Sequence, residues 1–414
     1  MTLVGVLVLI AQIIGGLLLL TLIVVVHELG HYFMARKNGI EVEEFGIGFP
    51  PAAYKRKLKN GVVLSINWLP IGGFCRVKGE NSADKRKGTY GSASFKGKTQ
   101  FLLAGVAANL IFAALVFTVL SLFGMPKLIP NQFVVPADNH EILGPVEIAH
   151  VVEGSVAAEN GLQSGDILIS IAGQAVLSSS EVPSMTAAHK GEEVAVVVER
   201  TAITCETSGD DIPPFNGPAV CGVQYQYELT KTVTLSDGAD GKGVLGISTF
   251  SEESNRATWS APIVGVALTA QLTYETFKGL GGMLGNLFVG IFENIQGLFN
   301  SGVDAGAGSA KIASAGDGLS GPIGIIGILF PGAFASGISV VLLLIGVISL
   351  SLAVMNLLPI PALDGGRWLL VIFSKVTQKE ISKETEEKII TRGFMAILAL
   401  AALTIFLDIW RLAT

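Results

Sequence analysis

The feature that most constrains this chain is an uncharged apolar run from Val4 to Val26, which ends directly in His27-Glu28-Leu29-Gly30-His31. Within the run only Gln12 and Thr21 are polar. A helix of this length is long enough to cross the roughly 30 Å hydrocarbon core of a bilayer. The run therefore predicts a transmembrane helix with three ionisable side chains at its end.

The residues that end the run have the H-E-x-x-H pattern. On a helix, His27 and His31 are four residues apart and lie on the same face. Two such imidazoles are ligands for zinc, and Glu28 can act as a general base toward a water on the metal. Three ionisable groups at a bilayer edge need a compensating partner, which favours a bound metal ion. The alternative is two interfacial histidines, because short matches of this kind arise by chance.

Composition indicates several membrane spans together with one soluble domain. Half of the 414 residues are hydrophobic, only 15% are charged, and the mean hydropathy is +0.58. Soluble domains have nearer ~25% charged residues. The first apolar run is too long for a signal peptide and lacks a basic segment before it and a cleavage site after it. We therefore expect it to be retained as a span, and we expect no nucleic-acid partner.

Three further apolar runs of about 20 residues predict transmembrane helices, at Phe101–Gly124, Ile338–Leu358 and Ile389–Ile409. The stretch Ala261–Phe299 is also apolar, but charged residues and many glycines interrupt it. We expect it to be an amphipathic helix on the membrane surface, and the alternative is an additional pair of spans. Residues 301–318 are rich in Gly, Ala and Ser, which is typical of a flexible connector.

Charge predicts the orientation of these helices. Residues 34–99 carry 13 Lys and Arg against 5 Asp and Glu, a net charge of +8, whereas residues 127–253 carry 5 against 18, a net charge of −13. Loops rich in Lys and Arg remain in the cytoplasm, so we expect the basic segment inside and the acidic segment outside. The two histidines of the motif then lie near the cytoplasmic face.

The basic segment contains a stretch that predicts a β-hairpin. Val62–Leu69 partly alternates and is rich in β-branched residues, Pro70 and Gly72-Gly73 follow, and Phe74–Val77 resumes the strand. The hairpin is apolar enough to dip into the bilayer, where non-helical backbone is tolerated only against protein or a water-filled cavity. Beside the metal helix it would line such a cavity. The alternative is a small hairpin on the cytoplasmic surface.

The acidic segment resembles a PDZ domain of the type found with bacterial proteases. Val151–Ala158 is followed by Gly161–Leu168, which matches the short helix, turn and strand of such domains, and strands are also expected at Val194–Val198 and near Val244–Ile247. Domains of this type capture an extended peptide or a chain end by strand addition. Residues 201–230 look like an insertion. Its cysteines, Cys205 and Cys221, would form a disulfide in an oxidising compartment or remain free thiols.

A catalytic zinc ion takes three protein ligands and a water. The remaining histidines, His140, His150 and His189, fall in the segment expected outside, so a carboxylate near a span must complete the site. Asp364 follows the third predicted span at its cytoplasmic end, level with the two motif histidines. Asp408 lies about 20 residues along a helix that starts inside, hence roughly 30 Å away. The predicted topology selects Asp364 as the third ligand.

The sequence before Asp364 contains Asn356, Pro359 and Pro361, and Gly365-Gly366 follows. The prolines break the helix and free backbone groups with which an extended peptide could pair, while the glycines allow a sharp turn. Asn356 could donate to an oxyanion or bind substrate backbone. The alternative, which this segment by itself would favour, is a proline-terminated helix with a capping aspartate.

The two metal motifs together resemble those of the site-2 protease family of intramembrane zinc metalloproteases, and most closely its bacterial regulator-of-sigma-E group. Further matches extend over nearly the whole chain: Phe45–Phe49, Pro70–Phe74, Gly105-x-x-x-Asn109, Leu319–Pro322 and Asn356-x-x-Pro359.

The resemblance implies that His27, His31 and Asp364 bind Zn²⁺ and that Glu28 is the base. It also implies that Asn109, Asn356 and Pro359 contribute to substrate binding, and that the hairpin holds the substrate in extended form. The chain departs from the group at Val106, where Pro is usual, and in having room for one PDZ domain where the best-known members have two.

The predicted fold is a polytopic α-helical membrane protein of about four transmembrane helices, with a membrane-associated β-hairpin and one inserted extracytoplasmic PDZ domain of β-rich α+β type. In chain order we expect a first transmembrane helix with the histidine motif (1–34), a cytoplasmic loop with the hairpin (35–98), a second transmembrane helix (99–125), the PDZ domain with its insertion (126–255), an amphipathic helix and connector (256–332), a third transmembrane helix with the aspartate motif (333–366), a cytoplasmic loop (367–388) and a fourth transmembrane helix (389–411).

The predicted function is hydrolysis of peptide bonds within or near transmembrane segments of membrane proteins, in the bacterial cytoplasmic (inner) membrane. Expected partners are the lipid bilayer, membrane-protein substrates such as an anti-sigma factor or signal-peptide remnants, and a peptide or chain end at the PDZ domain. One alternative is a catalytically silent PDZ-bearing membrane scaffold or chaperone. The other is a metal transporter, which would need ligands distributed through mid-membrane helices.

Overall fold

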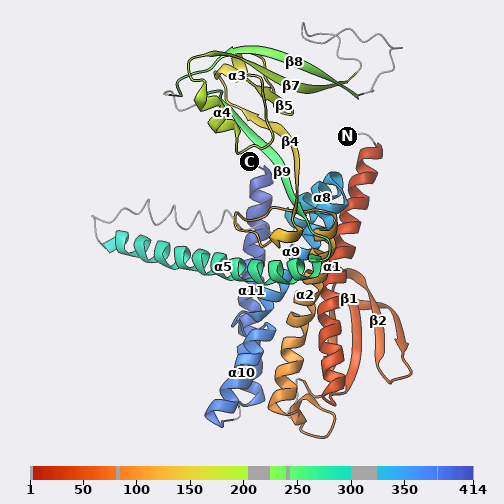
Figure 1. Cartoon of the computed structure of the whole chain (residues 1–414). Helices are drawn as coiled ribbons and strands as arrows, with labels where there is room; N and C mark the ends of the chain where they lie inside the picture. The colour runs from red at the N-terminus through yellow and green to blue at the C-terminus, as the bar shows by residue number, and fades with distance from the viewer. Residues whose placement is uncertain are drawn as a thin grey trace. The chain divides into compact units, whose positions relative to one another are not determined.

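The structure is a computed structural model that describes residues 3–80, 84–203, 224–238, 243–299, 324–379 and 381–413. The chain forms two compact units (Figure 1). The first unit comprises Met1–Phe123 and Thr258–Thr414, and the second comprises Gly124–Ala257. All the residues that the sequence predicts for the metal site and its base belong to the first unit.

Long apolar helices form the framework of the first unit. Within the described ranges three helices are long and apolar enough to cross a membrane: α1 (Leu3–Lys37), α2 (Phe95–Phe123) and α9 (Ile338–Leu357). α2 packs against both α1 and α9. Small residues allow this packing, because Gly30 of α1 lies against the backbone of Ala104, and Gly346 of α9 lies against the ring of Phe117. The first three predicted spans are thus confirmed as apolar helices of sufficient length.

The remaining helices of the first unit are shorter or less apolar. The π-helix η3 (Ile325–Leu329) and α8 (Phe330–Ser336) precede α9, and α10 (Asp364–Thr377) follows it. The predicted fourth span falls within α11 (Lys383–Ala413), which is one helix. That α11 crosses the membrane stays a prediction. The predicted connector 301–318 lies outside the described residues.

The sequence allows two structures for residues 261–299, a surface helix or an additional pair of spans. The structure has a single helix there, α5 (Ala261–Phe299). A continuous helix of 39 residues has no turn at which the chain could reverse, so the alternative of an additional pair of spans is wrong. At its start α5 packs against α2, where Gly265 lies against Ala114 and Thr118. Its position on the membrane surface stays a prediction.

The β-hairpin is present, but the sequence misplaced one of its strands. Residues 62–77 were expected to form both strands, whereas β2 (Val63–Val77) is one strand and pairs antiparallel with β1 (Val42–Lys57). The prolines Pro50-Pro51 and the cationic end of β1 conceal the apolar alternation that would have indicated this strand. Phe45 lies opposite Cys75 near the base of the hairpin, and Lys57 lies opposite Val63 beside its turn.

The hairpin packs along the apolar part of α1. The buried hydroxyl of Thr21 donates to the carbonyl of Pro70 on β2 at 2.6 Å, and it also lies 2.9 Å from the carbonyl of Leu17. Thr21 belongs to the uncharged run and lies six residues before His27, hence about 9 Å along the helix. β2 therefore reaches beyond the metal motif along the apolar helix. Large apolar side chains on the hairpin are exposed, namely Phe49, Tyr54, Ile66, Trp68, Leu69 and Ile71.

We predict that Thr21→Val loosens the hairpin from α1. Valine keeps the shape of threonine but removes the donor to Pro70, which costs about 1 kcal/mol. Trypsin should then cleave faster at the cationic end of β1, measured on the purified full chain in detergent. The matched control is Thr276→Val, because the Thr276 hydroxyl contacts only the carbonyl of Leu272 within its own helix. Equal cleavage rates for the two variants would contradict this role of Thr21.

The second unit is a sheet with two short helices. Its strands are β3 (Met125–Pro126), β4 (His140–Val151), β5 (Ile167–Ile171), β6 (Gln174–Ala175), β7 (Glu193–Ile203), β8 (Gln224–Thr234) and β9 (Ile247–Arg256), in the order β3-β9-β4-β5-β7-β8 with β6 beside β5. The helices are α3 (Val156–Glu159) and α4 (Val182–Ala188). Ile148, Leu168 and Val196 are fully or almost fully buried in its core.

The turn predicted between the short helix and the next strand is held by an ion pair. Asp166 accepts from the backbone N–H of Gln163 at 2.9 Å and from Nε of Arg200 at 2.6 Å. Because Asp166 is buried, this pairing fixes the turn between α3 and β5. Cys205 and Cys221, for which the sequence leaves a disulfide and two free thiols open, lie outside the described residues.

Candidate metal centre

The two motif histidines project from α1 toward α2. His27 and His31 are each about 6% exposed, so the helix pair encloses both rings. Gly105 of α2 makes this possible, because a Cβ atom there would lie 2.5 Å from Nε2 of either histidine. The glycine therefore allows the helix backbone to pass directly beside the two imidazoles.

Asp364 reaches the same point from the other end of the chain. α9 ends at Leu357, and Asp364 is the first residue of α10. The connecting turn packs on the start of α10 so closely that a Cβ atom on Gly365 or Gly366 would clash with its carbonyl oxygens. The break at the prolines and the two glycines thus turns the chain so that Asp364 faces α1.

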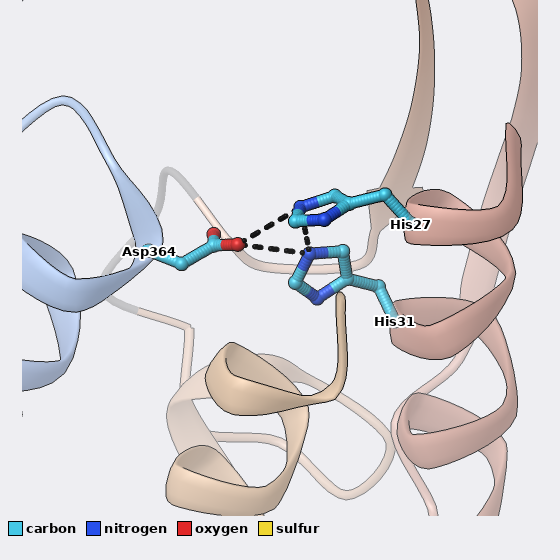
Figure 2. A group of neighbouring side chains, drawn as sticks. All are labelled: His27, His31 and Asp364. Atoms are coloured by element: carbon cyan, nitrogen blue, oxygen red, sulfur yellow. Dashed lines mark hydrogen bonds and ion pairs between the residues drawn. The ribbon is translucent and has the colours of Figure 1, made fainter. Parts of the chain in front are cut away.

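Figure 2 shows the rings of His27 and His31, one helical turn apart on α1, facing the carboxylate of Asp364. The Oδ2 atom of Asp364 lies 3.1 Å from Nε2 of His27 and 3.1 Å from Nε2 of His31. The two Nε2 atoms are 3.2 Å apart. Three atoms that could bind a metal ion (metal-donor atoms), contributed by two distant segments, therefore form a nearly equilateral triangle.

This triangle has the size that a zinc ion requires. Ligand atoms about 2.0–2.1 Å from a tetrahedral zinc ion lie about 3.3–3.4 Å from one another, close to the observed separations. Nitrogen from histidine and oxygen from aspartate are also ligand types that zinc accepts. Within the described residues these three side chains are the group of His, Cys, Asp and Glu that could hold a metal ion. The donor set fits zinc in type, number and spacing.

The hydrogen bond behind His31 leaves its Nε2 free to bind a metal. Nδ1 of His31 lies 2.8 Å from the backbone carbonyl of Phe101, an acceptor, so Nδ1 carries the proton that it donates. In the neutral ring Nε2 then presents a lone pair toward His27 and Asp364. Electron pairs facing one another repel unless a cation lies between them, which favours a metal ion at this point.

Glu28 lies in a cavity beside the three donors. The cavity has a volume of about 400 Å³ and is lined by residues of α1, β2, the segment before α10 and α10 itself. The backbone N–H of Cys75 donates to the Glu28 carboxylate, and Gly73 lies close to the same side chain. β2 therefore positions Glu28 and also forms a wall of the cavity.

Burial and neighbouring charges determine the protonation states of two further groups in the cavity wall. Arg367 pairs with Glu80 at 2.7 Å; burial lowers the pKa of Arg367, but the Glu80 carboxylate outweighs burial and the pKa is raised. The guanidinium therefore remains charged. Burial and the negative charge of Glu28 raise the pKa of the Cys75 thiol, so Cys75 remains a neutral thiol and is a poor metal ligand.

The structure separates the three residues that the resemblance assigned to substrate binding. Asn356 lines the cavity, and its amide donates to the carbonyl of Leu352 at 3.0 Å. Pro359 is exposed in the turn before α10 and is not among the residues that line the cavity. Asn109 is fully buried on α2, with Nδ2 3.5 Å from Nδ1 of His27, so it has no exposed surface for a substrate.

The other candidate ligands lie elsewhere. His140, His150 and His189 belong to the second unit. The side chain of Asp408 is outside the described part of the chain. The Phe101 carbonyl and the Glu80–Arg367 pair could not be predicted from the sequence. A backbone acceptor leaves no signal there, and the pair joins residues far apart in the chain.

Comparison with known proteins agrees with a metallopeptidase site on membrane helices. The model of peptidase family M50 matches residues 15–400. A relative in Agrobacterium fabrum that bears the provisional name zinc metalloprotease is 27% identical over 412 residues, covering 95% of this chain and 94% of the relative. A similarly named Clostridium perfringens protein is 29% identical, with 96% and 98% covered. Metalloprotease MmpA of Caulobacter vibrioides is 26% identical, with 93% and 90% covered.

The fold and the donor set define a membrane-associated zinc metalloprotease. The chain belongs to peptidase family M50, the site-2 protease family, which confirms the resemblance inferred from its motifs.

We predict that Gly105→Ala abolishes metal binding. The added methyl group would occupy space beside both Nε2 atoms and push the rings out of the triangle. Metal analysis of the purified protein should fall from about one zinc per chain to near zero. The control is Gly279→Ala on α5, where a Cβ atom meets nothing within 4 Å. A Gly105→Ala protein that retains zinc at the wild-type level would contradict the close approach of α2.

Proposed function

We propose that this zinc metalloprotease hydrolyses peptide bonds within or near the transmembrane segments of other membrane proteins, with His27, His31 and Asp364 as zinc ligands and Glu28 as the catalytic base. The observation that carries the proposal is the position of the donor triangle. It lies where the uncharged run of α1 ends, in a cavity whose wall includes the apolar hairpin. A cavity at that place is accessible to a substrate held in the membrane.

Zinc bound by the three donors would supply a Lewis acid that polarises the scissile carbonyl and a water. Glu28 lies in the same cavity and is oriented by the Cys75 N–H. Its carboxylate removes the proton from the attacking water and then delivers it to the leaving amine. Asn356 also faces this cavity, where its amide group is a candidate donor to the substrate carbonyl.

A helical substrate must unwind first, because its carbonyl groups are otherwise bonded within the helix. β2 supports this step. The pairs described for Gly73–Val77 run to β1, while Phe74, Cys75 and Arg76 line the cavity. An extended substrate segment could therefore add beside β2 and place its backbone next to Glu28.

We predict that Glu28→Gln retains about one zinc per chain but lowers cleavage of a membrane-embedded reporter by about 10²–10⁴-fold. Glutamine preserves the size of the side chain but cannot accept the proton. The measurement uses purified enzyme and a tagged single-span reporter in the same lipid vesicles. Glu43→Gln, an exposed position on β1, is the matched control. Wild-type cleavage by Glu28→Gln would refute the assignment, and absence of zinc from the wild-type protein would favour the scaffold alternative.

We extend the proposal to the second unit, which we infer to be a PDZ domain on the extracytoplasmic side. The order short helix α3, Gly161–Leu168 turn and strand β5 supports it, as does the acidic charge of residues 127–253. Such a domain would bind a peptide or chain end and select which membrane proteins reach the protease. Anti-sigma factors and signal-peptide remnants are substrates of suitable form.

We also propose that the protein lies in the bacterial inner membrane with its active site near the cytoplasmic face, α11 as the fourth span and α5 on the surface. The basic charge of residues 34–99 supports this orientation. The proposal keeps the boundaries of the transmembrane helices, loops and PDZ domain that the sequence predicts.

A further inference from the structure

We propose that Asn109 is a positioning residue for the metal: its side-chain oxygen accepts the Nδ1–H of His27, which fixes the tautomer in which Nε2 binds zinc. This proposal rests on the assignment of His27, His31 and Asp364 as ligands. It gives Asn109 a role other than the substrate contact that the sequence had suggested.

The position of Asn109 singles it out. It lies on α2 behind His27, on the side of the ring opposite to Asp364: Nδ1 of His27 faces the Asn109 amide, while Nε2 faces Oδ2 of Asp364. Asn109 is 0% exposed, so water does not compete for its amide. Ser349 of α9 donates to the Asn109 backbone carbonyl at 3.0 Å and joins the two helices at this point.

The amide has one atom without a partner. Oδ1 of Asn109 is buried and finds no hydrogen-bond partner among the described residues, while Nδ2 is the atom that lies 3.5 Å from Nδ1 of His27. A half turn about the last side-chain bond exchanges the positions of these two atoms, which are nearly equal in size, so the amide occupies the same space in either orientation. In the turned orientation Oδ1 faces Nδ1 and gains a donor.

Metal binding at Nε2 of His27 is compatible with only one of the two orientations of the Asn109 amide. If Nδ2 faces His27, the ring must offer a lone pair at Nδ1, and the neutral ring then carries its proton on Nε2, where the metal has to bind. If Oδ1 faces His27, Nδ1 carries the proton and Nε2 is free. The Phe101 carbonyl already selects this second tautomer for His31. α2 thus provides an oxygen acceptor behind each histidine, one from its backbone and one from a side chain.

The resulting arrangement explains why Gly105 and Asn109 occur four residues apart. Both lie on the face of α2 that meets α1: Gly105 leaves room for the two rings, and Asn109 holds one of them. Partners of this kind orient a ligand ring and raise its basicity, and their loss costs about 10–100-fold in metal affinity.

The test measures Zn²⁺ affinity of the purified full chain in detergent by competition with a chelator. Asn109→Ala removes the acceptor and should weaken Zn²⁺ binding about 10–100-fold. Asn109→Asp restores an oxygen acceptor and should bind within about threefold of wild type. Ser121→Ala is the matched control, because Ser121 is a buried polar residue of α2 whose hydroxyl contacts only the Phe117 carbonyl. Equal affinity of Asn109→Ala and wild type, or an Asn109→Asp protein as weak as Asn109→Ala, would overturn the proposal.

A second measurement requires no change at Asn109 and so does not depend on whether these variants fold. In a ¹⁵N-histidine-labelled protein with His140, His150 and His189 replaced by Gln, only the two motif histidines report. With Zn²⁺ bound, both rings should carry a proton on Nδ1 and the metal on Nε2. A His27 ring with its proton on Nε2 would overturn the proposal. If His31→Ala bound Zn²⁺ as tightly as wild type, the ligand assignment itself would be wrong. The Asn109 variants test only the positioning role, so the two failures are distinguishable.

Discussion

The close contact between α1 and α2 is the constraint on which the site depends. Gly30 brings the two backbones together at Ala104, and Gly105 lets the imidazoles of His27 and His31 lie against α2. In a hydrocarbon environment no hydrophobic effect drives helices together, so small residues and buried hydrogen bonds determine their approach. The Phe101 carbonyl behind His31 comes from this same contact. If α2 were farther away, both imidazoles would be more exposed and His31 would lose the carbonyl that fixes its tautomer.

The hairpin meets a second requirement of the proposed hydrolysis in a membrane. Hydrolysis needs water and an extended substrate, and lipid tolerates neither unpaired backbone nor charge. β2 packs on α1 through Thr21, extends beside the metal motif and donates the Cys75 N–H to Glu28. The same strand therefore lies beside the apolar helix, contacts Glu28, the proposed base, and lines the cavity. The charged pair Glu80–Arg367 lies in that cavity wall, where both side chains are largely buried.

Individual elements show how far the sequence could be interpreted. The spacing of His27 and His31 and the position of Asp364 after an apolar run were sufficient to predict the triangle, because helix periodicity and membrane topology restrict where such residues can meet. The strand β1 was missed, since its prolines and cationic end do not alternate. For α5, the glycines and charges allowed either a surface helix or a pair of spans, and only the continuous helix excluded the pair of spans. A motif match assigns Asn109 to substrate binding but carries no information about its burial, which only the structure provides.

The sequence by itself determined the long apolar helices, the residue types of the metal site and the family, since these follow from hydropathy, spacing and motif identity. Only the tertiary structure decided which nitrogen of each histidine, and which oxygen of Asp364, points toward the other ligands. Distances of about 3 Å between Asp364 and the two histidines arise from the packing of three segments far apart in the chain. The same holds for the Phe101 carbonyl and the Asn109 amide behind the rings. Hydrogen bonds are directional and short in range, so local sequence cannot specify them until the helices are in contact.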